Sequence, residues 1–219
     1  MGHCSMASLN HPILDQSFAV IDQEFGDHSF SPAEYAIVRR VIHSTADFEF
    51  KHLVRFSQGA IAGAIAALQQ QVPIVVDVSM VRQGIHTLVG QTFQNPILTA
   101  VEFGTPALPG KTRTETGMLH CLATYPTAIF VVGNAPTALM ALCHTWRDRP
   151  SAQAAQLPAL VIGAPVGFIS VLESKQLLAQ TAVPQIRIEG RKGGSPAAAA
   201  ILNALLVLAW EASCQDTTP

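Results

Sequence analysis

The sequence has few charged residues, few cysteines and no marker of export. Only 13% of its 219 residues are Asp, Glu, Lys or Arg, and the formal net charge is −2. A generally basic surface is therefore excluded, and nucleic acid is not an expected partner. The opening residues MGHCSMASLN lack the basic segment and the apolar stretch of a signal peptide. These absences together predict a cytoplasmic protein.

Metal sites and membrane spans also lack support. The four cysteines have no paired spacing, and Cys121 and Cys143 fall in apolar helical patterns typical of small core residues. His43 and His52 do not have the i, i+4 spacing of a helical metal pair. No window contains the roughly 18 uninterrupted apolar residues of a membrane span. The most apolar segment, 196–210, is short and suits a buried helix.

Hydrophobic residues, in contrast, are abundant. They make up 49% of the chain, which is enough for one large core. With so little surface charge, we expect some apolar surface to be covered by a partner subunit or a large ligand. A homodimer is the simplest such assembly.

The periodicity of apolar residues predicts an α/β fold. Ser31, Pro32 and Glu34 give a clear helix start, and further helices are expected over 11–25 and 58–70. Short apolar runs follow that suit strands covered on both faces, at 72–78, 97–103, 128–133, 159–164 and 185–189. Helical patterns separate or follow them, at 114–124, 136–147, 171–181 and 195–211.

This alternation predicts a three-layer α/β/α domain with a mainly parallel sheet and an N-terminal helical section. We expect residues 1–10 to be frayed, residues 11–212 to form the single domain, and residues 213–219 to form a C-terminal tail.

Distinctive residues follow the predicted strands, where ligands bind in open α/β sheets. Asp77 to Met80 follow the first strand, and loops rich in Gly and Pro follow at 133–137, 163–168 and 190–195. Helix starts attract anions, and Arg191 and Lys192 lie in the last loop. An ordinary strand-to-helix turn explains any one of these loops, but the series favours an anion site. Neither GxxxxGK[ST] nor GxGxxG occurs, which argues against a nucleotide.

His43 is the candidate acid or base. It lies near the end of the helix that starts at Ser31, beside Asp47 and Glu49, and histidine exchanges protons near neutral pH. A histidine stabilised by the helix dipole is an equally good interpretation from the residues alone. No nucleophile motif such as GxSxG is present.

Eight motifs in order resemble the precorrin-8X methylmutase family, also called cobalt-precorrin-8 methylmutase, from about residue 11 to 211. They are SFAVID (17–22), VIHSTADFEF (41–50), VRFS (54–57), PIVVDVSMVRQGI (73–85), TRTETGM (112–118), VVGNAPTAL (131–139), GAPVGFISVLESK (163–175) and GRKGGSPAAAAILNAL (190–205). The resemblance implies an isomerase that needs no cofactor and shifts a methyl group between adjacent carbons of a tetrapyrrole, giving hydrogenobyrinic acid or its cobalt counterpart.

The resemblance also assigns roles. His43 matches the family's histidine, which protonates the ring or hydrogen-bonds to it. Arg40, Arg113 and Arg191 would pair with substrate carboxylates, because guanidinium binds carboxylate through two parallel hydrogen bonds. The other expected substrate-binding residues are Ser17, Asp77, Met80, Asn134, Gly193 and Gly194. Asp47 and Glu49 would orient His43 or pair with Arg55. The resemblance also implies a homodimer with the site near the subunit interface. Thr114 and Glu115 depart from the family pattern at the start of the helix expected at 114–124.

Two other functions remain open from the sequence. A corrin-binding carrier without turnover would have the same pocket as the enzyme. A nucleotide-dependent transferase would explain the glycine loops, but the nucleotide fingerprints are missing.

Overall fold

A mixed sheet forms the middle layer of the computed structural model, which describes residues 9, 11–147 and 157–215. In these residues the sheet has six strands in the order β1-β6-β5-β4-β2-β3. The inner strands are parallel, and only β1, at one edge, runs antiparallel to its neighbour β6. The strands are β1 (Val54–Phe56), β2 (Ile74–Val76), β3 (Ile97–Thr99), β4 (Ile129–Val132), β5 (Leu160–Gly163) and β6 (Gln185–Ile188).

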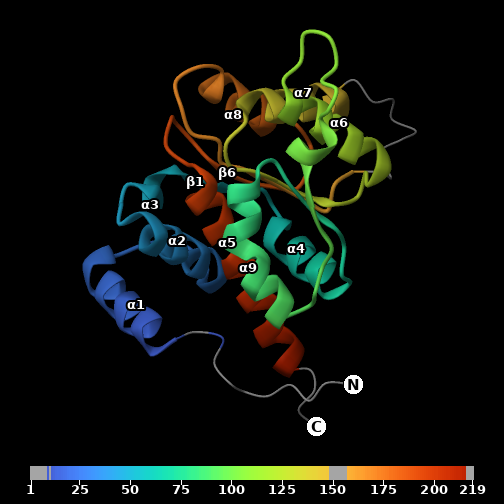
Figure 1. Ribbon diagram of the computed structural model, residues 1–219. Helices are drawn as coiled ribbons and strands as arrows, with labels where there is room; N and C mark the ends of the chain where they lie inside the picture. Colours follow the sequence, from blue (N-terminus) through green and yellow to red (C-terminus); the bar gives the residue numbers. More distant parts are fainter. Residues whose placement is uncertain (1–8, 10, 148–156, 216–219) are drawn as a thin grey trace.

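Helices cover both faces of the sheet, as Figure 1 shows. Alternating strand residues separate two cores: Ile74 and Val76 pack into one, and Val75 packs into the other. The first core is completed by α1 (Pro12–Phe25), α2 (Pro32–Thr45), α4 (Ala60–Gln69), α5 (Ser79–Gln91) and α9 (Ser195–Gln215). The second is completed by α6 (Arg113–Thr124), α7 (Pro136–Arg147) and α8 (Val171–Ala179). The predicted three-layer architecture is therefore confirmed.

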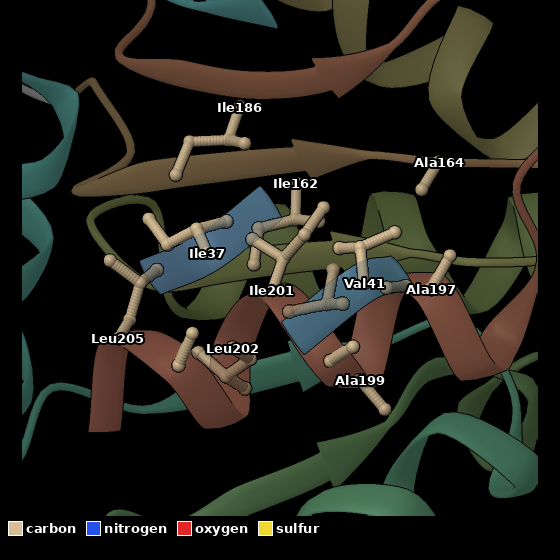
Figure 2. Packing of buried hydrophobic residues seen from close by; sticks show 14 of the residues in the cluster. Ile37, Val41, Ile162, Ala164, Ile186, Ala197, Ala199, Ile201, Leu202 and Leu205 are labelled. Carbon is tan, nitrogen blue, oxygen red and sulfur yellow. The ribbon is translucent and has the colours of Figure 1, made fainter. Parts of the chain in front are cut away.

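Helix α9 is the central helix of the first core. Its Ile201, Leu202 and Leu205 pack against Ile37 of α2 and the strand residue Ile162 (Figure 2). Length and composition alone would let α9 span a membrane, but 56% of its most apolar window is buried in the protein. Burial on this scale identifies it as a core helix, as the sequence predicted.

Small residues let the neighbouring helices come close to α9. A Cβ atom added to Gly84 of α5 would lie 2.8 Å from the Cβ of Ala199, which leaves no room for a larger residue. The side-chain amide of Asn203 donates to the Gly84 carbonyl at 2.8 Å, so a polar contact completes this tight packing.

Local signals in the sequence correspond to local structure. The backbone N–H of Ser31 donates to Glu34 at 2.8 Å, and the Ser31 hydroxyl accepts from the Glu34 N–H at 3.3 Å. This reciprocal pair is the predicted start of α2. Cys121 and Cys143 are buried, and burial raises the pKa of their thiols to about 11 and about 12. Both are therefore core residues, as predicted.

Several predicted elements were wrong in extent or missing. The strand expected over 97–103 ends at Thr99, and Ala100–Phe103 form the 3₁₀ helix η1. Helix α5, the short α3 (Phe50–Leu53) and strand β1 were not predicted. Helix α9 continues to Gln215, beyond the domain end expected at residue 212. The expected frayed start, apart from residue 9, and the tail from residue 216 lie outside the described residues.

Candidate active site

Asp77 lies at the carboxyl end of the parallel strands and organises the loops there. It follows β2 directly, and its carboxylate accepts the backbone N–H groups of Asn134 at 2.6 Å and Ala135 at 2.8 Å. A third N–H, that of Val78, donates to it at 3.0 Å. Asn134 and Ala135 form the turn into α7, so the negative charge lies at the start of that helix, where the dipole favours it. Asp77 thus joins the end of β2 to the turn after β4.

The environment of Asp77 corrects one prediction. The residue has no exposed surface, and burial raises the pKa of its carboxyl group, while the surrounding backbone N–H groups oppose that rise. A carboxylate that is buried and surrounded by backbone donors cannot line an open substrate site. The expectation of direct substrate contact was therefore wrong, and Asp77 shapes the loop that presents Asn134, which is exposed.

The loop between β6 and α9, residues 190–194, packs tightly against the end of β5. Gly193 and Gly194 have φ angles of 148° and 106°, which side-chain-bearing residues rarely adopt. A Cβ atom on Gly193 would lie 2.4 Å from the Ala164 carbonyl oxygen. The Gly194 N–H donates to that same oxygen at 2.8 Å. Glycine is therefore required at position 193 by both conformation and space.

Arg191 projects from this loop. Its side chain is exposed, and its guanidinium carbon lies 5.8 Å from the centre of the Phe168 ring, which is 84% exposed. Ile169, next to Phe168, is 81% exposed. A cation beside exposed apolar side chains suits a ligand that is flat, apolar and fringed with carboxylates.

His43 lies in the last turn of α2 and is exposed to solvent. Its ring meets the ring of Phe18 edge-on, with centroids 5.6 Å apart. Partial burial and the nearby Arg40 guanidinium lower the pKa of the His43 imidazole below its ordinary value of 6.5. The pKa of Arg40 is itself lowered, by burial and by Arg39. At neutral pH His43 is therefore mainly an uncharged imidazole beside a cation.

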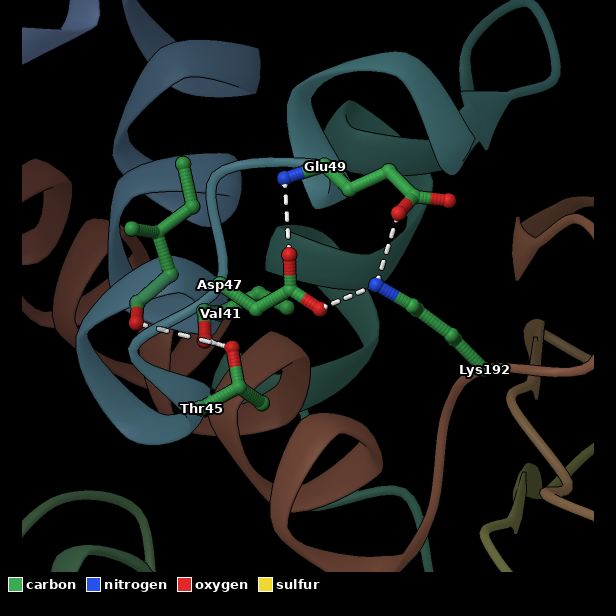
Figure 3. A network of polar contacts seen from close by, with 6 residues as sticks. Val41, Thr45, Asp47, Glu49 and Lys192 are labelled. Carbon is green, nitrogen blue, oxygen red and sulfur yellow. Dashed lines mark hydrogen bonds and ion pairs between the residues drawn. The ribbon is translucent and has the colours of Figure 1, made fainter.

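A lysine bridge connects the end of α2 with the 190–194 loop (Figure 3). The Lys192 ammonium contacts Asp47 at 2.6 Å and Glu49 at 2.7 Å, and Asp47 also accepts the Glu49 N–H at 2.9 Å. The bond from Lys192 lowers the pKa of Asp47. Four residues after His43, the chain is thus tied to the loop that carries Arg191.

The bridge corrects a second prediction. Asp47 and Glu49 were expected to orient His43 or to pair with Arg55. In the structure both pair with Lys192, whereas Arg55 pairs with Glu189 at 3.1 Å.

Arg113 lies on the other face of the sheet from His43. It begins α6, and its guanidinium donates to the Val101 carbonyl at 3.4 Å. Glu115, which departs from the family pattern, pairs with Lys111 at 2.5 Å. His43 and Arg40 therefore belong to the N-terminal helices, and Arg113 belongs to the opposite layer.

The remaining predicted residues differ in exposure. Ser17 is half-buried on α1 beside Phe18, and Met80, in the first turn of α5, is 67% exposed. A cleft next to Arg40 has a volume of about 80 Å³ and is lined by Phe18, Ala36, Arg39, Arg40, Ala204, Val207, Leu208 and Glu211. Pockets that enclose organic ligands measure roughly 300–1,000 Å³. This cleft alone is therefore too small to enclose a macrocycle.

Lys175 is the functional candidate that the sequence analysis missed. It is only 3% exposed, and its ammonium donates to the carbonyls of Gly190 and Lys192, both at 2.7 Å. Burial lowers the pKa of this ammonium to about 8. A signal was present, because Val171, Ser174, Lys175 and Leu178 share the i, i+3, i+4, i+7 spacing of a buried helix face.

Comparison with known proteins gives a consistent result. A family model described as precorrin-8X methylmutase matches residues 12–208. A cobalt-precorrin-8 methylmutase from Synechocystis is 56% identical over 94% of this chain and 99% of its own length. A precorrin-8X methylmutase from Pseudomonas aeruginosa is 36% identical over 88% of this chain and 93% of its own length.

A solved structure shares the fold as well as the sequence. The crystal structure of the precorrin-8X methylmutase from Thermus thermophilus superposes with a TM-score of 0.82 at 42% identity, over 92% of this chain and 99% of the other. Together these matches show that the chain belongs to the precorrin-8X methylmutase family.

Proposed function

We propose that this chain moves a methyl group between adjacent carbons of a bound precorrin-8X or cobalt-precorrin-8, and so acts as an isomerase of corrin biosynthesis. Relatives named cobalt-precorrin-8 methylmutase and precorrin-8X methylmutase are 56% and 36% identical to it over most of their length. A shift within one molecule needs positioning and a proton at the right atom more than it needs a nucleophile. The residues of the site suit such a reaction.

His43 is the proposed proton donor or hydrogen-bond partner of the ring. The observation that carries this role is its exposure at the end of α2, next to Arg40 and four residues before the bridge to the 190–194 loop. The free imidazole is mainly neutral because its pKa is lowered. Carboxylates of a bound substrate would oppose the field of Arg40 and raise that pKa, which would favour proton uptake as the complex forms.

The proposed binding groups come from helices on both faces of the sheet and from the loops that follow its strands. Arg40, Arg113 and Arg191 would pair with carboxylates, and Ser17, Met80, Asn134, Gly193 and Gly194 would line the ring. Met80 and Asn134 follow β2 and β4, and both are exposed. Because Arg113 and His43 lie on opposite faces of the sheet, one ligand could meet both only by crossing its edge.

We further propose a cytoplasmic homodimer that works without a cofactor. The small cleft beside Arg40 and the exposed Phe168 and Ile169 support a site that a second subunit helps to cover. A site covered by a second subunit would also remove more of the apolar surface of the tetrapyrrole from water.

The test compares two histidine variants. His43→Ala should abolish conversion of precorrin-8X, followed by the visible spectrum, and should leave the unfolding transition unchanged because the side chain is exposed. His52→Ala is the matched control, since His52 is an exposed histidine of the neighbouring α3. Equal rates for His43→Ala and the wild type would overturn the role of His43.

The same assay separates enzyme from carrier. An enzyme converts many equivalents of precorrin-8X per subunit, whereas a carrier changes the spectrum of one equivalent and stops. Saturation at one equivalent by the wild-type protein would replace the methylmutase proposal with the carrier.

A further inference from the structure

Lys175 is a buried cation that donates hydrogen bonds to two backbone carbonyls. Its two acceptors, the carbonyls of Gly190 and Lys192, lie on either side of Arg191 in the 190–194 loop. Within the described parts of the chain, no carboxylate lies within ion-pair distance of its ammonium. A buried charge without a counter-ion is costly, so this arrangement needs a compensating role.

The bonds to Lys175 determine which backbone groups the loop turns inward. With both carbonyls drawn toward the ammonium, their negative ends face the interior of the protein. Between them, the side chain of Arg191 is exposed, and the Arg191 carbonyl accepts the Gly167 N–H at 3.3 Å. All three carbonyls of residues 190–192 thus accept hydrogen bonds from donors of the protein, and none of them needs to face an approaching anion.

We infer that Lys175 is a positioning residue for substrate binding: it holds the 190–194 loop so that Arg191 and the positive face of the loop meet a carboxylate of the ligand. The inference rests on the proposed function, because it takes the loop to be part of the tetrapyrrole site. Lys175 itself is almost fully buried and does not touch the substrate. It acts through the backbone of Gly190 and Lys192.

Other charged groups near Lys175 are already paired. Arg187 and Glu189 line the same cleft as Lys175 and bond to each other at 3.2 Å. Lys192, whose carbonyl Lys175 holds, directs its own ammonium to Asp47 and Glu49. The group free to lose its proton in this cluster at mildly alkaline pH is therefore Lys175, whose pKa is about 8.

The experiment measures steady-state kinetics of the full-length protein with precorrin-8X. Lys175→Met should raise KM about tenfold, equivalent to ~1.4 kcal/mol of binding, with kcat changed much less. Lys175→Arg, which keeps the charge and donors, should restore part of the affinity. Lys51→Met is the matched control, because the Lys51 ammonium also donates to a backbone carbonyl, that of Phe25 at 3.4 Å, but in a different part of the fold.

A pH profile distinguishes this role from simple structural support. The wild-type KM should rise as the pH passes about 8, because the neutral amine holds the carbonyls less strongly and adds no positive field. This readout needs no variant, so it applies even if Lys175→Met fails to fold. A wild-type KM that stays constant between pH 7 and 9.5 would overturn the inference.

A double substitution tests whether Lys175 acts through Arg191. If it does, Lys175→Met should have a much smaller effect on KM in an Arg191→Ala background than in the wild type. Additive effects would show that Lys175 acts elsewhere. Failure of the wild type to convert precorrin-8X would remove both proposals, whereas normal wild-type turnover with an unchanged KM in Lys175→Met would remove only the inference about Lys175.

Discussion

Two loops at the carboxyl end of the parallel strands are organised by buried charges of opposite sign. The turn after β4 is held by the Asp77 carboxylate, which accepts backbone N–H groups. The 190–194 loop is held by the Lys175 ammonium, which donates to backbone carbonyls. An anion gathers N–H groups around itself and leaves carbonyls to face outward, and a cation does the reverse. The loop held by the cation is therefore the better one to receive a carboxylate.

The largest expected effect comes from removing the anion. Asp77→Ala would leave the N–H groups of Asn134, Ala135 and Val78 without their acceptor, and that of Ala135 is buried, so we expect a cost of about 4 kcal/mol in the free energy of unfolding. Chemical denaturation measures the loss. Asp15→Ala, which removes an exposed carboxylate from α1, is the control and should change stability by less than ~1 kcal/mol. A loss as small as that of the control would mean that Asp77 does not hold the turn.

The second-largest expected effect concerns the tight packing of the 190–194 loop. Gly193→Ala would force a Cβ atom toward the Ala164 carbonyl at a φ angle of 148°, so we expect a loss of about 3 kcal/mol together with weaker substrate binding. Gly190→Ala is the matched control, because a Cβ there meets nothing within 4 Å although φ is 72°. It should lose only ~1 kcal/mol. Equal losses would show that backbone conformation alone, without close packing, requires Gly193.

The two buried charges should also affect stability in opposite directions as pH changes. The pKa of Asp77 is raised, so the unfolded chain loses that proton first and the contribution of Asp77 to stability falls as the pH rises above its ordinary value of 3.8. The pKa of Lys175 is lowered from 10.5 to about 8, so the folded chain loses that proton first and stability rises between about pH 8 and 10.5.

Difference curves make this prediction measurable. The free energy of unfolding, determined by denaturant titration at several pH values, is compared between the wild type and Asp77→Asn in the acid range, and between the wild type and Lys175→Met in the alkaline range. Each variant should lose the slope that belongs to its own residue. Slopes of the same sign would contradict the comparison.

The smallest effect concerns the exposed bridge of Lys192. Lys192→Met should lower Tm by no more than about 2 °C, because solvent-exposed ion pairs contribute little. Added salt at 0.5 M should reduce the difference from the wild type, since it screens the pair. Lys175→Met, whose charge is buried, should remain different from the wild type in the same salt. A salt-independent effect of Lys192→Met would mean that the bridge acts as a buried contact.

The sequence was sufficient for most of the architecture. Helix starts such as Ser31 with Glu34, and β-branched runs such as 72–78, depend on neighbouring residues and can be recognised locally. Strand β1 could not, because three residues including Arg55 are too short for a periodic pattern and pair only with the distant β6. Helix α5 carried a signal in Val81, Ile85 and Val89, but its glycines and polar residues obscured it.

The candidate site was predictable only in part. Motifs located His43 and the 190–194 loop, since both lie in short, recognisable segments. The partners of Asp47 and Glu49 could not be predicted, because Lys192 is more than 140 residues away in the chain. The burial of Asp77 could not be predicted either. The sequence pattern of an aspartate after a strand is the same whether its side chain faces a ligand or the backbone of a neighbouring turn.

The short edge strands of the sheet affect how copies of the chain can associate. Its outer strands, β1 and β3, have three residues each, and β3 turns at once into the η1 helix. Such short edge strands present few unpaired backbone N–H and C=O groups to another polypeptide, so edge-to-edge aggregation is disfavoured. Any contact between copies of this chain would therefore involve side chains on helices and loops, and a concentrated preparation should resist conversion into fibrils.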